Sequence, residues 1–270
     1  CHQVARRFAP SYRGPLGCLG DRKPDFPAAV PAAADRAWLA GLYRAELAYT
    51  DRQLGRLLAG LTQLGLDRNT VVAIVSDHGE EFWTRLDEER SLGYEANGDH
   101  GHTLYQELLR VPAMIRVPGL RPRVIRDPAG MADLFPTLLR LAGVEPPESQ
   151  GRDLTPLLDG HPAVRATFIA DVILHGASRW AVRRGPWKLI VPRAPGLPLE
   201  LYDLIADPGE SRNLAAAQPR LVATLRAFGE REIAARVAAR PRLLSGSDTL
   251  SATYLEWNHI TKLRSLGYLK

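Results

Sequence analysis

The fold class is decided by residues 70–80, which read Thr70-Val71-Val72-Ala73-Ile74-Val75-Ser76-Asp77-His78-Gly79-Glu80. The β-branched run at residues 71–75 has no polar alternation, which is typical of a strand buried on both faces in a parallel sheet. Ahead of it, apolar residues recur at helical steps over residues 36–61 and predict an amphipathic helix that Gly65 ends. A long helix, a short turn and a buried strand together indicate an α/β fold.

Two side chains that can bind a metal follow this strand directly. Asp77 and His78 would point to opposite faces within a strand, but beyond its end Gly79 lets the backbone turn so that both converge on one cation. Ligands of open α/β sheets bind at the carboxyl ends of the strands. A carboxylate beside an imidazole suits calcium, manganese or zinc. These residues alone leave the alternative equally open, namely a turn in which Asp77 caps the next segment and His78 faces solvent.

A second polar cluster, Asp99-His100-Gly101-His102-Thr103, stands just before a helix predicted over residues 103–109. The free N–H groups and the dipole of a helix N-terminus favour anions. His100 or His102 could donate a hydrogen bond to a sulfate or phosphate oxygen there, or protonate a leaving group. Taken by itself, the cluster is better explained as a loop with two solvent-facing imidazoles.

The character of the sequence changes near Asp159. Before it, a second apolar strand is predicted at residues 111–117 and an amphipathic helix at residues 131–141. After it, Gly and Pro turns separate short strand candidates, which predict a small antiparallel sheet formed by residues 166–171, 180–183, 187–191 and 199–202.

Two further helices are predicted, one from Pro219 to about Arg236 and a short one within residues 256–270. We therefore divide the chain into three parts. They are an irregular lead-in (residues 1–34), an α/β domain (residues 35–158), and a small C-terminal subdomain with a tail helix (residues 159–270).

Several motifs follow one another along nearly the whole chain from about Tyr43. They are residues 49–58 (YTDRQLGRLL), 70–80 (TVVAIVSDHGE), 100–112 (HGHTLYQELLRVP), 133–143 (DLFPTLLRLAG), 151–154 (GRDL), 181–204, 207–214 and 263–269. Their order resembles the sulfatase family of the alkaline-phosphatase superfamily. The resemblance implies an α/β fold with a mostly parallel sheet sandwiched by helices. A small C-terminal α+β subdomain with an antiparallel sheet would follow.

The resemblance also implies an activity, the metal-dependent hydrolysis of sulfate monoesters of small molecules or carbohydrates. Asp77 and His78 would be metal ligands, with calcium as the first expectation and manganese or zinc as alternatives. His100 and His102 stand where the family places a basic residue that contacts the sulfate. His78 replaces the Asn of many sulfatases, and the His form also occurs in related hydrolases of phosphate and phosphonate esters. Those esters are therefore the first alternative.

The nucleophile of the family is not found in this chain. Neither Cys1 nor Cys18 lies in the family's Cys-x-Pro-Ser-Arg context, in which the cysteine becomes formylglycine, and no early Asp pair is present. We expect these parts upstream of Cys1, which would make the chain a fragment that is inactive alone. A non-catalytic remnant or binding protein is the second alternative.

Composition narrows the classes of partner. The net charge is +5, but the basic residues alternate with acids and form no stripe with interleaved aromatics, so we expect no nucleic acid as partner. No apolar run approaches the ~18 residues of a membrane span. The compartment cannot be read, because any targeting segment would precede Cys1, although the family is compatible with a periplasmic or extracellular location.

Overall fold

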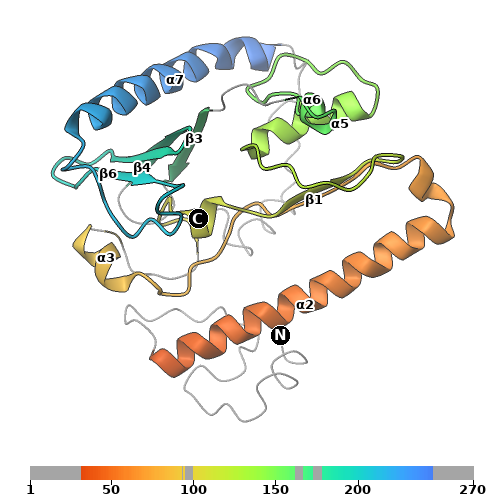
Figure 1. Ribbon diagram of the computed structural model, residues 1–270, viewed down its shortest axis with the longest axis horizontal. Coiled ribbons are helices and arrows are strands. Elements are labelled where there is room, and N and C mark those ends of the chain that lie inside the picture. The colour runs from red at the N-terminus through yellow and green to blue at the C-terminus, as the bar shows by residue number, and fades with distance from the viewer. Residues whose placement is uncertain (1–31, 93, 95–99, 162–166, 173–177, 246–270) are drawn as a thin grey trace.

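The computed structural model describes residues 32–92, 94, 100–161, 167–172 and 178–245. The long helix α2 (Ala33–Gln63) leads through the 3₁₀ turn η1 (Leu66–Arg68) into the strand β1 (Val72–Val75), as Figure 1 shows. The remaining elements are, in order, α3 (Leu86–Ser91), α4 (Gln106–Leu109), β2 (Ala113–Arg116), η2 (Met131–Asp133), α5 (Leu134–Leu141), α6 (Thr155–Leu158), β3 (Thr167–Val172), β4 (Arg179–Arg184), β5 (Trp187–Pro192), β6 (Glu200–Asp203) and α7 (Pro219–Ser245).

The first sheet pairs β1 with β2 in antiparallel order, with Val75 opposite Ala113. The chain leaves β1 and enters β2 at the same end, because the connection folds back and the Gly79 N–H donates to the Leu108 carbonyl (2.8 Å). The mostly parallel sheet sandwiched by helices is therefore not confirmed. The strands of the described ranges pair only antiparallel, and β1 is partly exposed rather than buried on both faces.

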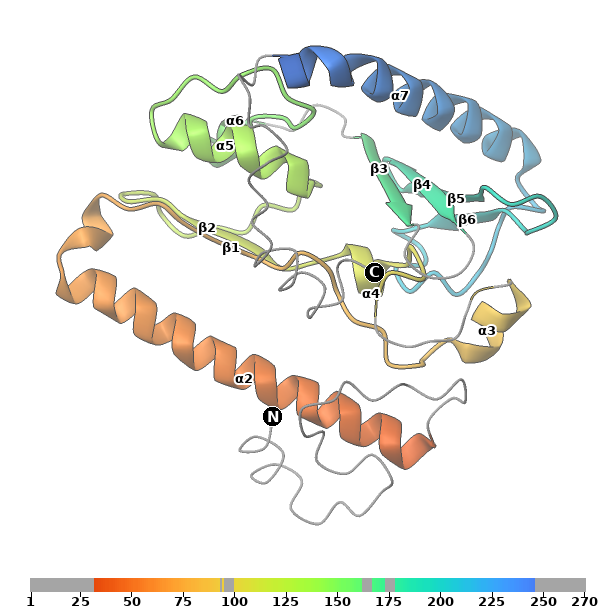
Figure 2. The ribbon, with the colours of Figure 1, turned by 180° about the vertical axis from the view of Figure 1, so that it is seen from behind.

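The second sheet has the strand order β3-β4-β5-β6 and is antiparallel throughout. The prediction that residues 180–183 and 187–191 are neighbouring strands outside the first sheet is confirmed. Gly185, with a φ of +60°, sits in the tight turn between them, where a left-handed residue is needed. Helix α7 lies along this sheet (Figures 1 and 2), and Gly229 brings it so close that an added Cβ would be 2.4 Å from the Trp180 ring.

One core joins this sheet to the connection between β1 and β2. Tyr94 and Tyr105 pack in a single buried cluster with Tyr202 of β6. Their three hydroxyls donate to the buried Glu200 carboxylate over 2.5, 2.7 and 2.9 Å. Burial, together with the negative charge of Glu200, raises the pKa of each tyrosine. The packing thus crosses the predicted boundary at residue 158, and the division into domains stays a prediction.

Several element boundaries differ from those predicted. Helix α3 lies in a stretch that reads as a polar insertion, because its sequence has no apolar period and its buried member is a charged residue, Glu89. The helix predicted over residues 103–109 is only the short α4, whereas α7 continues past Arg236 to Ser245. The tail helix within residues 256–270 lies outside the described ranges. No helix within those ranges is both long and apolar enough to cross a membrane.

Candidate active site

The turn after β1 holds the first two predicted site residues close together. Asp77 Oδ1 lies 3.7 Å from His78 Nε2 and also accepts the backbone N–H of His78 (3.0 Å). The other ring nitrogen, His78 Nδ1, is 2.8 Å from the Gly79 carbonyl oxygen, which orients the imidazole. Asp77 is mostly exposed, with 68% of its side-chain surface accessible, whereas His78 is half-buried. The turn therefore presents a carboxylate and an oriented imidazole on the same side.

Gly79 allows this turn to press against the backbone of α4. An added Cβ at Gly79 would be 1.8 Å from the Glu107 carbonyl oxygen and 2.8 Å from its carbon, both of them backbone atoms. The Gly79 N–H donates to the next carbonyl, that of Leu108. The turn that carries Asp77 and His78 can therefore contact α4 only because residue 79 has no side chain.

We expect Gly79→Ala to lower the free energy of unfolding by roughly 1–3 kcal/mol, since the clash involves backbone atoms that cannot rotate away. Gly55→Ala on α2 is the matched control, because a Cβ there meets nothing within 4 Å and should be neutral or stabilising by about 0.5–1 kcal/mol. Thermal unfolding of both variants measures the difference. Equal melting temperatures would show that the close approach is absent.

His100 stacks on His78, with ring centroids 3.7 Å apart and an angle of 23° between the planes. His100 Nδ1 also lies 3.6 Å from Glu80 Oε1. His78, Glu80 and His100 each offer one ligand atom, and these atoms all lie within 4.8 Å of one another. The negative charges of Glu80 and Asp77 add to burial in raising the pKa of Tyr43, which places the α2 tyrosine beside this group. The arrangement is a compact set of donors for a divalent cation.

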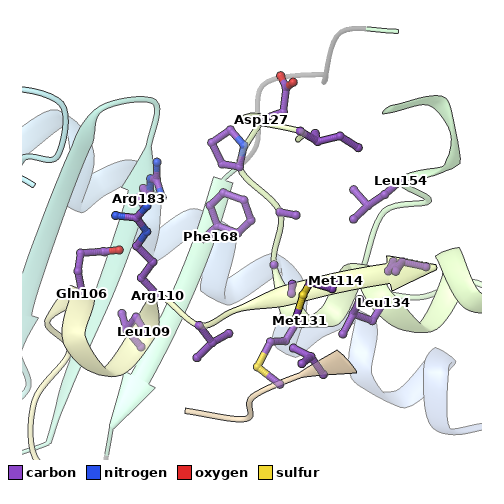
Figure 3. Close-up of a pocket in the computed structure, with 18 of the residues that line it drawn as sticks. Gln106, Leu109, Arg110, Met114, Asp127, Met131, Leu134, Leu154, Phe168 and Arg183 are labelled. Atoms are coloured by element: carbon purple, nitrogen blue, oxygen red, sulfur yellow. The ribbon is translucent and has the colours of Figure 1, made fainter. Parts of the chain in front are cut away.

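A cavity of about 1360 Å³ opens in front of this group. Asp77, His78 and His100 all line it, so the sequence prediction that one histidine of the second cluster shares a cavity with the metal motif is met by His100. Figure 3 shows Arg110, which follows α4, and Arg183 of β4 beside the same cavity. Burial and then the positive charge of Arg110 lower the pKa of Arg183, so the two guanidinium groups repel each other.

His102 is placed differently. Its side chain is fully buried, is absent from the cavity lining, and lies with Nε2 3.5 Å from Glu89 Oε1 and 4.0 Å from Glu81 Oε2. The structure thus separates the two histidines that the sequence treats as equivalent. Asp99, which belongs to the same predicted cluster, lies outside the described residues.

Two family models match this chain. The family model described as Sulfatase matches residues 19–144, and the model described as N-sulphoglucosamine sulphohydrolase, C-terminal, matches residues 98–228. The chain belongs to the sulfatase family. Members of this family are generally metal-dependent, and the donor set at the end of β1 lies within the first matched region.

Among curated sulfatases, the chain is 35% identical to mouse steryl-sulfatase over 272 residues, which cover 85% of this chain and 42% of the relative. It is 32% identical to choline-sulfatase of Rhizobium meliloti (strain 1021) over 195 residues, which cover 69% of this chain and 35% of that protein. The chain therefore spans less than half the length of these sulfatases.

The chain also resembles solved structures of such hydrolases. One in complex with its substrate D-glucosamine-2-N,6-O-disulfate has 25% identity and a TM-score of 0.61, covering 75% of this chain and 42% of that chain. The phosphonate monoester hydrolase of Agrobacterium radiobacter has 26% identity and a TM-score of 0.57, covering 77% and 43% respectively. The solved structures that resemble this chain thus include one that is named for the hydrolysis of another class of ester.

Sequence reasoning missed three residues of this candidate site. Glu80 follows the metal motif directly, and its position next to Gly79 was a signal that could have been used. Arg110 and Arg183 are far apart in the chain, and only the packing of β4 beside α4 brings them to one cavity. No sequence pattern distinguishes these two from the many other arginines.

Proposed function

We propose that the full-length protein hydrolyses sulfate monoesters with the help of a divalent cation. The observation that carries this proposal is the group of imidazoles and carboxylates at the end of β1, where Asp77, His78 and His100 line one cavity. Arg110 and Arg183 support an anionic substrate, because they bring two positive charges to the same cavity.

The residues present fit a metal. Asp77 and His78 remain the proposed ligands, and Glu80 joins them because its carboxylate oxygen lies within 4.8 Å of a ring nitrogen of His78 that could bind the same ion. Calcium takes six to eight oxygen ligands, whereas imidazole suits zinc and other transition ions, so the donor set supports zinc or manganese over the calcium first expected. When bound, the cation would neutralise charge that develops on the ester oxygens.

The other roles follow from position. His100 would donate a hydrogen bond to an oxygen of the sulfate, since its ring is held by His78 on one face and lines the cavity. Arg110 and Arg183 would bind a further anionic part of the ester or its sulfate. The nucleophile, which we expect to be formylglycine, would come from sequence upstream of this chain.

The test is hydrolysis of an aryl sulfate by the full-length protein, before and after removal of metal with a chelator. We expect turnover that is lost with the metal and restored by zinc or manganese. Phosphonate monoester hydrolysis is the second candidate, favoured by His78 and by the Agrobacterium radiobacter relative. A phosphonate monoester turned over faster than the sulfate would replace the first proposal by the second, and turnover of neither would refute both.

A further inference from the structure

We propose that Glu81, Glu89 and His102 form a second divalent-cation site, built from residues other than those at the end of β1. The three side chains come from separate stretches of the connection between β1 and β2: the segment after β1, helix α3 and the segment before α4. Their exposed fractions are 1%, 0% and 1% respectively. The inference is independent of the ester that the protein hydrolyses.

Polar atoms of this buried cluster have no hydrogen-bond partner. Within the described residues, this holds for Glu81 Oε2, for both carboxylate oxygens of Glu89 and for both ring nitrogens of His102. The other oxygen, Glu81 Oε1, accepts the backbone N–H of Thr84 (2.5 Å) and its hydroxyl (3.2 Å). These bonds hold the Glu81 carboxylate in place and leave Oε2 available to bind a metal ion. Carboxylates that bind metals are commonly oriented by such hydrogen bonds.

Charge balance favours a metal ion over a proton at this cluster. Burying a carboxylate without a partner is strongly destabilising, so two of them side by side require positive charge. A protonated His102 would supply a single charge to Glu81 and Glu89, so neutrality without a metal would need a second proton, on one of the carboxylates. A divalent ion neutralises both carboxylates and binds His102 in its neutral form.

The distances suit a small transition ion. His102 Nε2 lies 3.5 Å from Glu89 Oε1 and 4.0 Å from Glu81 Oε2, and all three ligand atoms lie within 4.8 Å of one another. Zinc bonds of about 2.0–2.2 Å in a tetrahedral site separate the ligand atoms by roughly 3.3–3.5 Å. The pair of His102 with Glu89 already has this spacing, and only Glu81 needs a small shift. One imidazole and two carboxylates match zinc well among first-row ions.

The test uses the full-length protein, stripped of metal, re-equilibrated with zinc and freed of excess ion, and measures bound zinc by mass spectrometry. We expect Glu89→Gln to bind one equivalent less than the wild type. Glu88→Gln is the matched control on the same helix, since Glu88 pairs with Arg85 and lies outside the cluster, and it should bind as much as the wild type. The equivalent lost in Glu89→Gln should remain in His78→Ala, which removes a donor of the other group.

A second measurement needs only proteins that keep the cluster intact. At free zinc about 100-fold above the dissociation constant, the melting temperature of His78→Ala should rise by roughly 2–3 °C, since the unfolding entropy of so long a chain is large. Cobalt bound in place of zinc should give visible absorption bands in the same variant. Unchanged zinc content in Glu89→Gln, or a His78→Ala protein that shows neither the shift nor the bands, would overturn the proposal and leave a buried ion pair.

Discussion

Replacement of His100 by alanine in the full-length protein is expected to lower the rate on an aryl sulfate by about 10²-fold or more, with bound metal nearly unchanged. The reason is that a group touching the reacting oxygens but not the cation loses only transition-state stabilisation, as for an oxyanion-hole donor. Asp77→Ala should lower both the rate and the bound metal, because it removes a ligand. Paired measurements of turnover and metal content separate the two roles.

His161→Ala is the control for this prediction, since His161 is an exposed histidine outside the cavity lining and its loss should leave the rate unchanged. A drop in metal content in His100→Ala equal to that in Asp77→Ala would make His100 a ligand instead of a substrate contact. Rates near wild type for both His100→Ala and His102→Ala would reduce this segment to a structural loop.

Replacement of Lys188 by methionine is expected to lower the free energy of unfolding by about 3–5 kcal/mol, because it leaves a buried carboxylate without its partner. Lys188 Nζ lies 2.6 Å from Glu210 Oε1, and both side chains are fully buried. Burial lowers the pKa of Lys188 against the opposing charge of Glu210. Glu210 also accepts the Gln106 backbone N–H at the start of α4 (2.6 Å), so the loss should loosen the helix that Arg110 directly follows.

Urea unfolding of Lys188→Met, Glu210→Gln and the double variant forms the test of this second prediction. The double variant should be more stable than Lys188→Met alone, since a neutral amide costs less to bury than an unpaired carboxylate. Arg226→Met is the control, because its pair with Glu230 is exposed and such pairs contribute about 0–1 kcal/mol. A loss of less than about 1 kcal/mol in Lys188→Met would contradict the prediction.

Local patterns predicted most elements correctly where one period dominated the sequence. The apolar spacing over residues 36–61 predicted α2, and Gly and Pro turns separated the strands of the second sheet. The direction of pairing in the first sheet could not be derived, because it depends on the turn at Gly79 and its contact with α4, which are distant in the chain. Helix α3 was not predicted, because its buried residue is the charged Glu89 and its sequence has no apolar period.

The candidate site was predicted in part. Asp77, His78 and His100 came from short motifs, and the structure brings all three to one cavity. The distinction between His100 and His102 was out of reach, because the two are separated only by Gly101, whose φ of +84° turns the chain between them. His100 therefore lines the cavity, whereas His102 is buried away from it.

The tyrosine cluster around Glu200 limits how this chain can be exchanged with its relatives. A chimera joined at residue 158 would take Tyr94 and Tyr105 from one parent and Glu200 from the other. Unless both parents supply matching groups, buried hydroxyls or a buried carboxylate lose their bonds at the junction. The C-terminal sheet must therefore come from the same parent as the connection between β1 and β2, which carries the candidate site. A chimera meant to transfer substrate preference has to include both.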